Sequence, residues 1–204
     1  MTEFLGAVVE QFLQSSLLEL TAVVFAIAYL ILAVKENSLC WYAAAISTLI
    51  FLAIFWEVKL YMESGLQVFY LAMAAYGWYQ WRSADDGSAG LQISMWTMGQ
   101  HAIALTLIAL LTFLSGYLLQ SATDAQLPYL DSFTTWASVV TTFMVARKVL
   151  ENWIYWLVID SVSIYLYIDR ELYFTAILFA VYIVIIFFGW ASWSKSYQQK
   201  IQQV

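Results

Sequence analysis

Seven long apolar runs dominate the sequence and determine the environment in which it can fold. They lie near residues 17–35, 39–56, 63–81, 99–120, 132–148, 152–168 and 172–193. A helix needs roughly 20 apolar residues to cross the hydrocarbon core of a bilayer, which is ~30 Å thick. Because 63% of the 204 residues are apolar and 11% are charged, one soluble core could not bury this surface. The runs therefore predict an all-α integral membrane protein with seven transmembrane helices.

The remaining composition narrows the class of function. Acidic residues outnumber basic ones 14 to 8, which argues against a partner among nucleic acids. The single cysteine, Cys40, excludes an internal disulfide and cannot build a metal cluster. No G-x-x-x-x-G-K-[ST] loop is present for ATP hydrolysis, and the last run has no lysine that could bind retinal. We therefore expect neither an enzyme nor a cofactor.

The charges at the ends of the runs predict the orientation in the membrane. The first 16 residues carry Glu3 and Glu10 but no basic residue, so they predict a short amphipathic helix at the membrane surface rather than a signal peptide. Lys59 and Arg170 fall on the side of the N-terminus. The other side holds Lys35, Arg82, Arg147, Lys148, Lys195 and Lys200. The positive-inside rule then places the N-terminus outside and the C-terminus in the cytoplasm.

The chain matches itself without gaps at a shift of 112 positions. The matched pairs include Trp41 with Trp153, Glu57 with Asp169, Gly77 with Gly189, Trp78 with Trp190 and Trp81 with Trp193. Two G-W-x-x-W endings at one constant offset are hard to obtain by chance. The shift predicts a single transmembrane domain in which residues 17–81 and 131–193 are three-helix repeats and residues 99–120 a linker helix. Such a parallel 3+1+3 arrangement occurs in transporters that bind their substrate between the halves.

Asp160 is the most informative single residue. It lies about eight residues into the sixth run, roughly 12 Å deep at 1.5 Å per residue and therefore near mid-membrane. A carboxylate at that depth costs about 2.5–3.5 kcal/mol and by default marks a functional site. Steps of three and four place it on one stripe with Trp153, Trp156, Ser163 and Tyr167. An acid beside indole rings suits an organic cation. The alternative is that Asp160 pairs with a hydroxyl or a basic side chain and only orders the bundle.

Other polar and aromatic positions extend this candidate site. Thr48 takes the position of Asp160 in the first repeat, so the two halves are chemically unequal. Gln67 and Tyr70 share a face of the third run, and Tyr182 is the counterpart of Tyr70. The amide of Gln67 suits an amide or sugar hydroxyl of a ligand, or else a hydrogen bond between helices. The candidate binding residues are thus Trp153, Trp156, Asp160, Gln67, Tyr70, Ser163, Thr48 and Tyr182.

Five further residues carry less functional weight. Trp81 and Trp193 stand next to polar run ends, which predicts membrane-interface anchors rather than gates. Glu19 and Asp131 open their runs, where an acid stabilises a helix N-terminus. His101 begins the fourth run and is expected to face lipid headgroups, with a proton relay as the alternative.

Two blocks of sequence resemble the PnuC-type vitamin transporter family. The first is KLYMESGLQVFYLAMAAYGWYQWR at Lys59–Arg82. The second is ARKVLENWIYWLVIDSVSIYLYIDRELYFTAILFAVYIVIIFFGW at Ala146–Trp190, which contains a W-x-x-W at Trp153 and Trp156. The resemblance spans roughly residues 17–195, and the two blocks together are specific.

The resemblance implies the architecture, the cargo and the partners. Members are 3+1+3 facilitators, often trimeric, with an architecture related to the SWEET sugar carriers but a different helix order within each unit. They carry an unphosphorylated vitamin, most often nicotinamide riboside and otherwise thiamin or riboflavin, which a cytoplasmic kinase then traps by phosphorylation. By resemblance, Trp153, Trp156, Gln67 and Tyr70 line the binding pocket.

Residues and resemblance together predict facilitated diffusion of nicotinamide riboside by alternating access. The expected setting is a bacterial inner membrane, with lipid, the vitamin, a kinase and two further copies of the chain as partners. Nicotinamide riboside and thiamin both carry a ring cation, and Asp160 with its tryptophans suits either. Two alternatives stay open, namely a proton-coupled carrier that uses Asp160 and His101, and a membrane sensor that binds a ligand without moving it.

Overall fold

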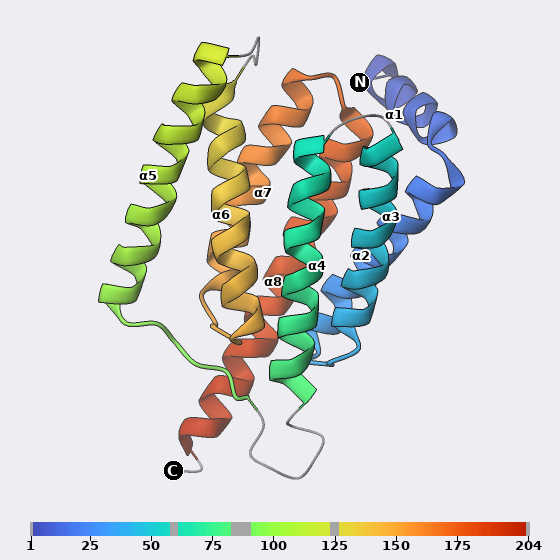
Figure 1. Cartoon of the computed structure of the whole chain (residues 1–204). Coiled ribbons are helices and arrows are strands. Elements are labelled where there is room, and N and C mark those ends of the chain that lie inside the picture. Colours follow the sequence, from blue (N-terminus) through green and yellow to red (C-terminus); the bar gives the residue numbers. More distant parts are fainter. Residues whose placement is uncertain (1, 58–60, 83–90, 123–126, 203–204) are drawn as a thin grey trace.

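The computed structural model describes residues 2–57, 61–82, 91–122 and 127–202. Within these residues the chain forms eight α-helices (Figure 1). They are α1 (Thr2–Gln14), α2 (Leu17–Val34), α3 (Cys40–Glu57), α4 (Tyr61–Arg82), α5 (Met98–Ala122), α6 (Pro128–Ala146), α7 (Asn152–Asp169) and α8 (Tyr173–Gln202). Helices α2 to α8 occupy the apolar runs of the sequence, so the expectation of an all-helical chain is confirmed.

The helix ends differ from the runs in a few places. Helix α8 continues to Gln202 because the polar stretch after Trp193 contains no glycine or proline that would end it. The N-terminal segment forms the short helix α1, as expected. The sequence SADDGSAG at Ser83–Gly90 predicts a loop, and these residues lie outside the described part of the chain. By length and hydropathy alone, three of the described helices are able to cross a membrane, namely α2, α5 and α8.

Side chains at the helix starts explain why two of these helices begin where they do. Ser16 precedes α2, and its hydroxyl accepts a hydrogen bond of 3.0 Å from the backbone N–H of Glu19. Pro128 occupies the first turn of α6, where its missing N–H costs nothing. Glu19 and Asp131 both lie in first turns, as expected for acids that favour the positive end of a helix dipole.

Replacing Ser16 with alanine is expected to lower the free energy of unfolding by about 1 kcal/mol, because the first turn of α2 loses its cap. Thermal unfolding of the detergent-purified protein measures this change. Ser161→Ala is the matched control, since the exposed hydroxyl of Ser161 only donates to the carbonyl of Leu157 within the same helix. Equal midpoints for the two variants would contradict the capping role.

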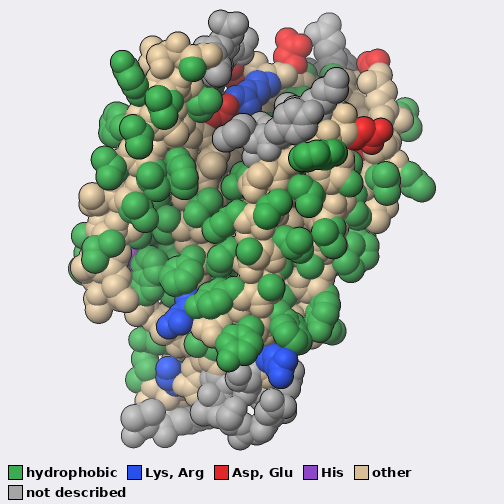
Figure 2. All heavy atoms as spheres, in the orientation of Figure 1, with side chains coloured by type: hydrophobic (Ala, Val, Ile, Leu, Met, Phe, Trp, Pro, Cys, Tyr) green, Lys and Arg blue, Asp and Glu red, His purple; other side chains and the backbone are tan. Residues whose placement is uncertain are grey.

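The helices pack as two bundles with α5 on the outside (Figure 1). Helix α3 packs against α2 and α4, and α7 packs against α6 and α8. The bundles meet where α4 contacts α6 and where α2 contacts α8. Helix α5 packs against α6, and α1 packs against α8. Apolar side chains cover the middle of the face shown in Figure 2, and charged side chains gather toward its two ends.

The turns that follow α2 and α6 have the same backbone form. Glu36 (φ 53°) and Lys148 (φ 50°) both adopt the left-handed region directly after the residues that cap the two helices. Only a few per cent of residues other than glycine do so, and these two stand 112 positions apart. The same chain reversal therefore occurs at the same position of each bundle.

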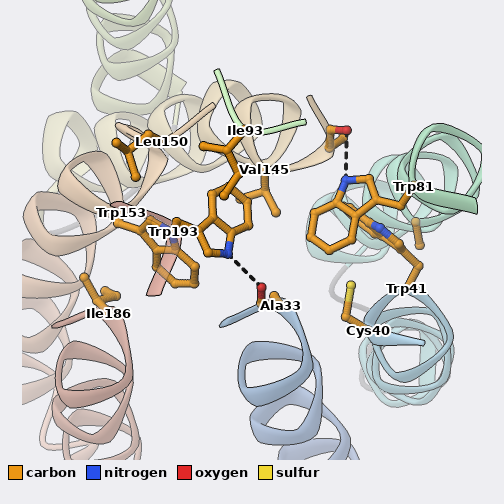
Figure 3. Packing of buried hydrophobic residues seen from close by; sticks show 12 residues of the cluster. Ala33, Cys40, Trp41, Trp81, Ile93, Val145, Leu150, Trp153, Ile186 and Trp193 are labelled. Atoms are coloured by element: carbon orange, nitrogen blue, oxygen red, sulfur yellow. Dashed lines mark hydrogen bonds between the residues drawn. The ribbon is translucent and has the colours of Figure 1, made fainter. Parts of the chain in front are cut away.

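Four tryptophans fill the end of the molecule at which these turns lie, and we name this region the tryptophan end. Its residues are Trp41, Trp81, Trp153 and Trp193, each no more than 2% exposed (Figure 3). Trp41 packs on Gly77, and Trp153 packs on Gly189, since the missing side chain of each glycine leaves room for an indole ring. The rings of Trp81 and Trp193 lie 5.9 Å apart.

The indole nitrogens of the tryptophan end also join the bundles. Trp81 Nε1 donates to the carbonyl of Ala146 at 3.1 Å, and Trp193 Nε1 donates to the carbonyl of Ala33 at 3.0 Å (Figure 3). The expectation that Trp81 and Trp193 anchor the protein at the membrane interface is therefore wrong. Each lies one helical turn after a glycine that faces the core, and this spacing directs the indole inward rather than toward lipid headgroups.

Candidate functional site

The stripe that contains Asp160 faces the interior of the protein. Asp160 is 3% exposed and Ser163 6% exposed, although both lie in the middle of α7. Trp156 and Tyr167 on the same stripe are half-buried. The helical spacing of the sequence thus placed these side chains on one inward face, as predicted.

Asp160 has aromatic hydroxyl groups as neighbours. Its carboxyl group lies close enough to the phenols of Tyr167 on α7 and Tyr182 on α8 to interact with them electrostatically. The ring of Phe179 contacts both tyrosines, with centroid distances of 5.0 Å to Tyr167 and 5.3 Å to Tyr182. An acid buried in this setting suits a ligand that brings a positive charge and hydroxyl groups.

The first bundle contributes phenols to the same region. Tyr70 on α4 lies near the hydroxyl of Ser138 on α6 and near Tyr167. Tyr29 on α2 lies near Tyr70 in turn. We name Tyr29, Tyr70, Tyr167 and Tyr182 with Asp160 the tyrosine cluster. It draws side chains from α2, α4, α7 and α8, and therefore lies across the junction of the two bundles.

The other candidate residues lie around this cluster or apart from it. Gln67 is half-buried on α4, one turn before Tyr70. Thr48 is 8% exposed on α3, inside the first bundle. Trp153 belongs to the tryptophan end, seven residues and roughly 10 Å along α7 from Asp160. Trp156 lies between Trp153 and Asp160 along α7. It packs against the tryptophan end and against a second hydrophobic cluster that contains Ile159.

The structure thus brings Asp160 and Tyr182 together, links Tyr70 to them through Tyr167, and leaves Trp153 further along α7. Two members of the cluster, Tyr29 and Tyr167, are not among the candidate binding residues predicted from the sequence, although Tyr167 was placed on the stripe of Asp160. Nothing in the apolar run around Tyr29 distinguished it, because its position next to Tyr70 depends on how α2 and α4 both pack against α3.

Two buried indole donors in the tryptophan end have no acceptor among the described residues. They are Trp41 Nε1 and Trp153 Nε1, at equivalent positions of the two bundles. The side-chain carbonyl of Asn152 likewise has no donor there. A buried polar group without a partner costs about 1–3 kcal/mol. A water or ligand with complementary polar atoms would recover this energy.

His101 belongs to a separate polar group outside the tyrosine cluster. Its Nδ1 lies 2.9 Å from the hydroxyl of Tyr155, and its Nε2 lies 3.5 Å from the carboxylate of Glu151. Glu151 is 8% exposed and also accepts from the backbone N–H of Trp96 at 3.3 Å. The imidazole therefore contacts the start of α7, through Glu151 at the N-cap and Tyr155 in the first turn. It does not lie free among lipid headgroups, as the sequence had suggested.

The opposite end of α7 carries an ion pair. Arg170 Nη2 lies 2.6 Å from Asp131 Oδ2, and both side chains are about one-third exposed. Tyr167 is close enough to both charges to sense them. The ion pair therefore lies beside the tyrosine cluster, on the side away from the tryptophan end.

Comparison with known proteins supports the architecture. In the set of solved structures, the crystal structure of the vitamin B3 transporter PnuC superposes with a TM-score of 0.72 at 21% identity, covering 97% of this chain and 90% of the other. At this identity the likeness shows that the two proteins share a fold, and in this chain the described residues of that fold form eight helices.

Sequence comparison identifies the family. The family model described as nicotinamide mononucleotide transporter matches residues 16–195. The nicotinamide riboside transporter PnuC of Escherichia coli is 25% identical over 194 residues, covering 83% of this chain and 81% of that protein. The riboflavin/roseoflavin transporter RibM of Streptomyces davaonensis is 25% identical over 136 residues, covering 64% and 63%. These relatives are membrane transporters and not enzymes. The chain therefore belongs to the nicotinamide mononucleotide transporter family, that of the PnuC-type vitamin transporters.

Proposed function

We propose that this protein carries unphosphorylated nicotinamide riboside across the bacterial inner membrane by facilitated diffusion. The observation that carries the proposal is Asp160, an acid 3% exposed in mid-helix beside Tyr167 and Tyr182 at the junction of the bundles. The pyridinium ring of nicotinamide riboside supplies a positive charge for this carboxylate, and its ribose supplies hydroxyl groups for the phenols. The relative from Escherichia coli is named for the same cargo.

We propose that α2 to α8 all span the membrane as a parallel 3+1+3 repeat with α5 as the linker helix. Buried polar residues lower the mean hydropathy of α4, α6 and α7. Asp160 is one of them, and they face the interior of the protein rather than lipid. Support comes from features at one offset of 112 positions, namely the two left-handed turns, the two glycine–tryptophan contacts and the two indole donors that join the bundles, Trp81 and Trp193. Alternating access then consists of motion of one bundle against the other.

The proposed orientation places the tryptophan end in the cytoplasm and the N-terminus outside. Six of the eight basic residues belong to the side of the tryptophan end. A cytoplasmic kinase would phosphorylate the vitamin there and prevent its return. The exposed apolar face of α5, which includes Ile103, Leu110 and Phe113, is available to lipid and to neighbouring copies in the proposed homotrimer.

Two other vitamins compete with nicotinamide riboside as the cargo. Riboflavin is named for the relative from Streptomyces davaonensis, and thiamin shares the ring cation. Riboflavin is neutral and would gain nothing from Asp160, whereas both cations would. The buried carboxyl group of Asp160 thus favours a cationic cargo over riboflavin.

Tryptophan fluorescence tests the cargo directly. Titration of the detergent-purified protein with nicotinamide riboside is expected to give saturable quenching, because Trp156 lies one helical turn before Asp160 on the same stripe of α7 and ten tryptophans contribute signal. Thiamin and riboflavin are titrated in parallel. Saturable quenching by riboflavin alone would contradict the cationic assignment. Uptake of the bound vitamin into sealed vesicles then separates a transporter from a sensor that only binds.

An imposed pH gradient tests the proton-coupled alternative. Facilitated diffusion predicts the same initial uptake rate with the gradient in either direction. The contacts of His101 with Tyr155 and Glu151, rather than with Asp160, favour this outcome. Uptake that rises steeply with an inward proton gradient would instead favour a proton-coupled carrier.

A further inference from the structure

Glu36 and Lys148 occupy the same position in the two halves of the chain, and their side chains contact each other. Lys148 Nζ lies 3.1 Å from Glu36 Oε2 across a separation of 112 residues. Under the proposed repeat, a contact between equivalent positions lies on the approximate two-fold axis that relates the halves. Two like charges at this position would repel each other, whereas the opposite charges of Glu36 and Lys148 attract each other and join the two halves of the chain.

The environment of this pair makes its separation costly. The side chain of Lys148 is 7% exposed, and that of Glu36 is 26% exposed. The ammonium group also lies 4.7 Å from the ring centroid of Trp81, which adds a cation–π contact. Removing one partner of a buried ion pair leaves the other charge uncompensated. The pair therefore biases the two helix turns strongly toward contact.

The pair belongs to a larger set of contacts at the tryptophan end. The two indole bonds, Trp81 to Ala146 and Trp193 to Ala33, join the bundles at the same end. Cys40 is the first residue of α3. It is 0% exposed and belongs to the same hydrophobic cluster as the four tryptophans of the tryptophan end (Figure 3). Helix α4 contacts α6 and α2 contacts α8 in this structure, and the indole bonds and the ion pair add to these contacts between the bundles at the tryptophan end.

We propose that the Glu36–Lys148 ion pair is a gate that closes the tryptophan end and must separate before cargo passes there. The role as a gate rests on the proposed transport function. The contact that closes this end rests only on the ion pair and the indole bonds. Closing this end excludes water from the tyrosine cluster while the cargo is bound or exchanged at the other end.

Cys40 provides a native reporter for the state of this end, because it is the only cysteine in the chain. The experiment measures the rate at which a water-soluble maleimide labels Cys40 in the full-length protein reconstituted in vesicles. Glu36→Gln is expected to raise the rate by about tenfold, in the range of conformational couplings. The double variant Glu36→Lys with Lys148→Glu is expected to restore the slow native rate, since both positions have nearly the same φ.

Arg170→Gln is the matched control, because it breaks an ion pair of similar length at the opposite end and should leave Cys40 labelling unchanged. Retained vitamin binding by Glu36→Gln shows that the variant is folded. Unchanged labelling of Glu36→Gln, or a charge exchange that labels as fast as the single variant, would overturn the gate. If native protein moves no vitamin but labelling follows the expected pattern, the transport function fails and the closing contact stands.

Discussion

Replacing Asp160 with asparagine is expected to weaken binding of nicotinamide riboside by about thirtyfold or more. Removing one partner of a buried charge pair costs about 2 kcal/mol or more, and 1.4 kcal/mol is a factor of ten in affinity. Asp160 is 3% exposed and has the phenols of Tyr167 and Tyr182 as neighbours, so solvent screens its charge from a bound cation only weakly. Equilibrium titration of the native and Asp160→Asn proteins by tryptophan quenching measures the change.

Two controls make this result specific to the charge of Asp160. Asp169→Asn makes the same chemical change at the exposed end of the same helix and should leave the affinity unchanged. If the protein also binds riboflavin, the affinity for this neutral vitamin should not fall in Asp160→Asn. Normal binding and transport by Asp160→Asn would make Asp160 a structural residue and remove the argument for a cationic cargo.

Alanine at Gly77 or Gly189 is expected to destabilise the fold by about 3 kcal/mol or more, near the upper end of overpacking effects. The added methyl group at Gly189 would lie 2.5 Å from Cη2 of Trp153, and the one at Gly77 would overlap the ring of Trp41. Neither ring can retreat, because both indoles are 2% exposed and packed against Trp193 and Trp81, respectively. The helix pairs α3–α4 and α7–α8 would have to separate.

Thermal unfolding in detergent measures the loss, with Gly65→Ala as the control on α4. A methyl group at Gly65 meets nothing within 4 Å, so this change should be neutral or stabilise the helix by up to about 1 kcal/mol. Similar midpoints for Gly65→Ala and Gly77→Ala would show that helix propensity rather than close packing controls this position. Because the two glycines are equivalent, Gly189→Ala should resemble Gly77→Ala.

The helices were predictable because apolar runs and turn residues act locally. The runs near residues 17–35 and 152–168 became α2 and α7 with changes of one residue at the ends. Helical spacing also placed Asp160, Ser163 and Trp153 on one buried face, since spacing along a helix is fixed by its geometry. Family membership followed from two blocks of sequence that the family model covers.

The contacts between helices were not predictable in the same way. Tyr29 joins the tyrosine cluster only through the rotation and packing of α2 against its neighbours, which no local pattern encodes. Trp81 was expected at the membrane surface because Arg82 follows it, yet its position relative to Gly77 decides its direction. The shift of 112 already related the positions of Glu36 and Lys148. It did not predict their ion pair, because the sequence does not show that the two turns meet.

The indole bond from Trp193 to Ala33 has a consequence for how the protein is made. The two residues are 160 positions apart in the chain. At ribosomal rates of about 5–20 residues per second, Trp193 is therefore synthesised roughly 10–30 s after Ala33. During this time the carbonyl of Ala33 lacks its hydrogen-bond donor. Ala146, which accepts from Trp81, is likewise synthesised after the first bundle. Under the proposed topology, the first bundle therefore enters the membrane with an unfilled face, and the insertion machinery or lipid occupies that face until translation reaches α8.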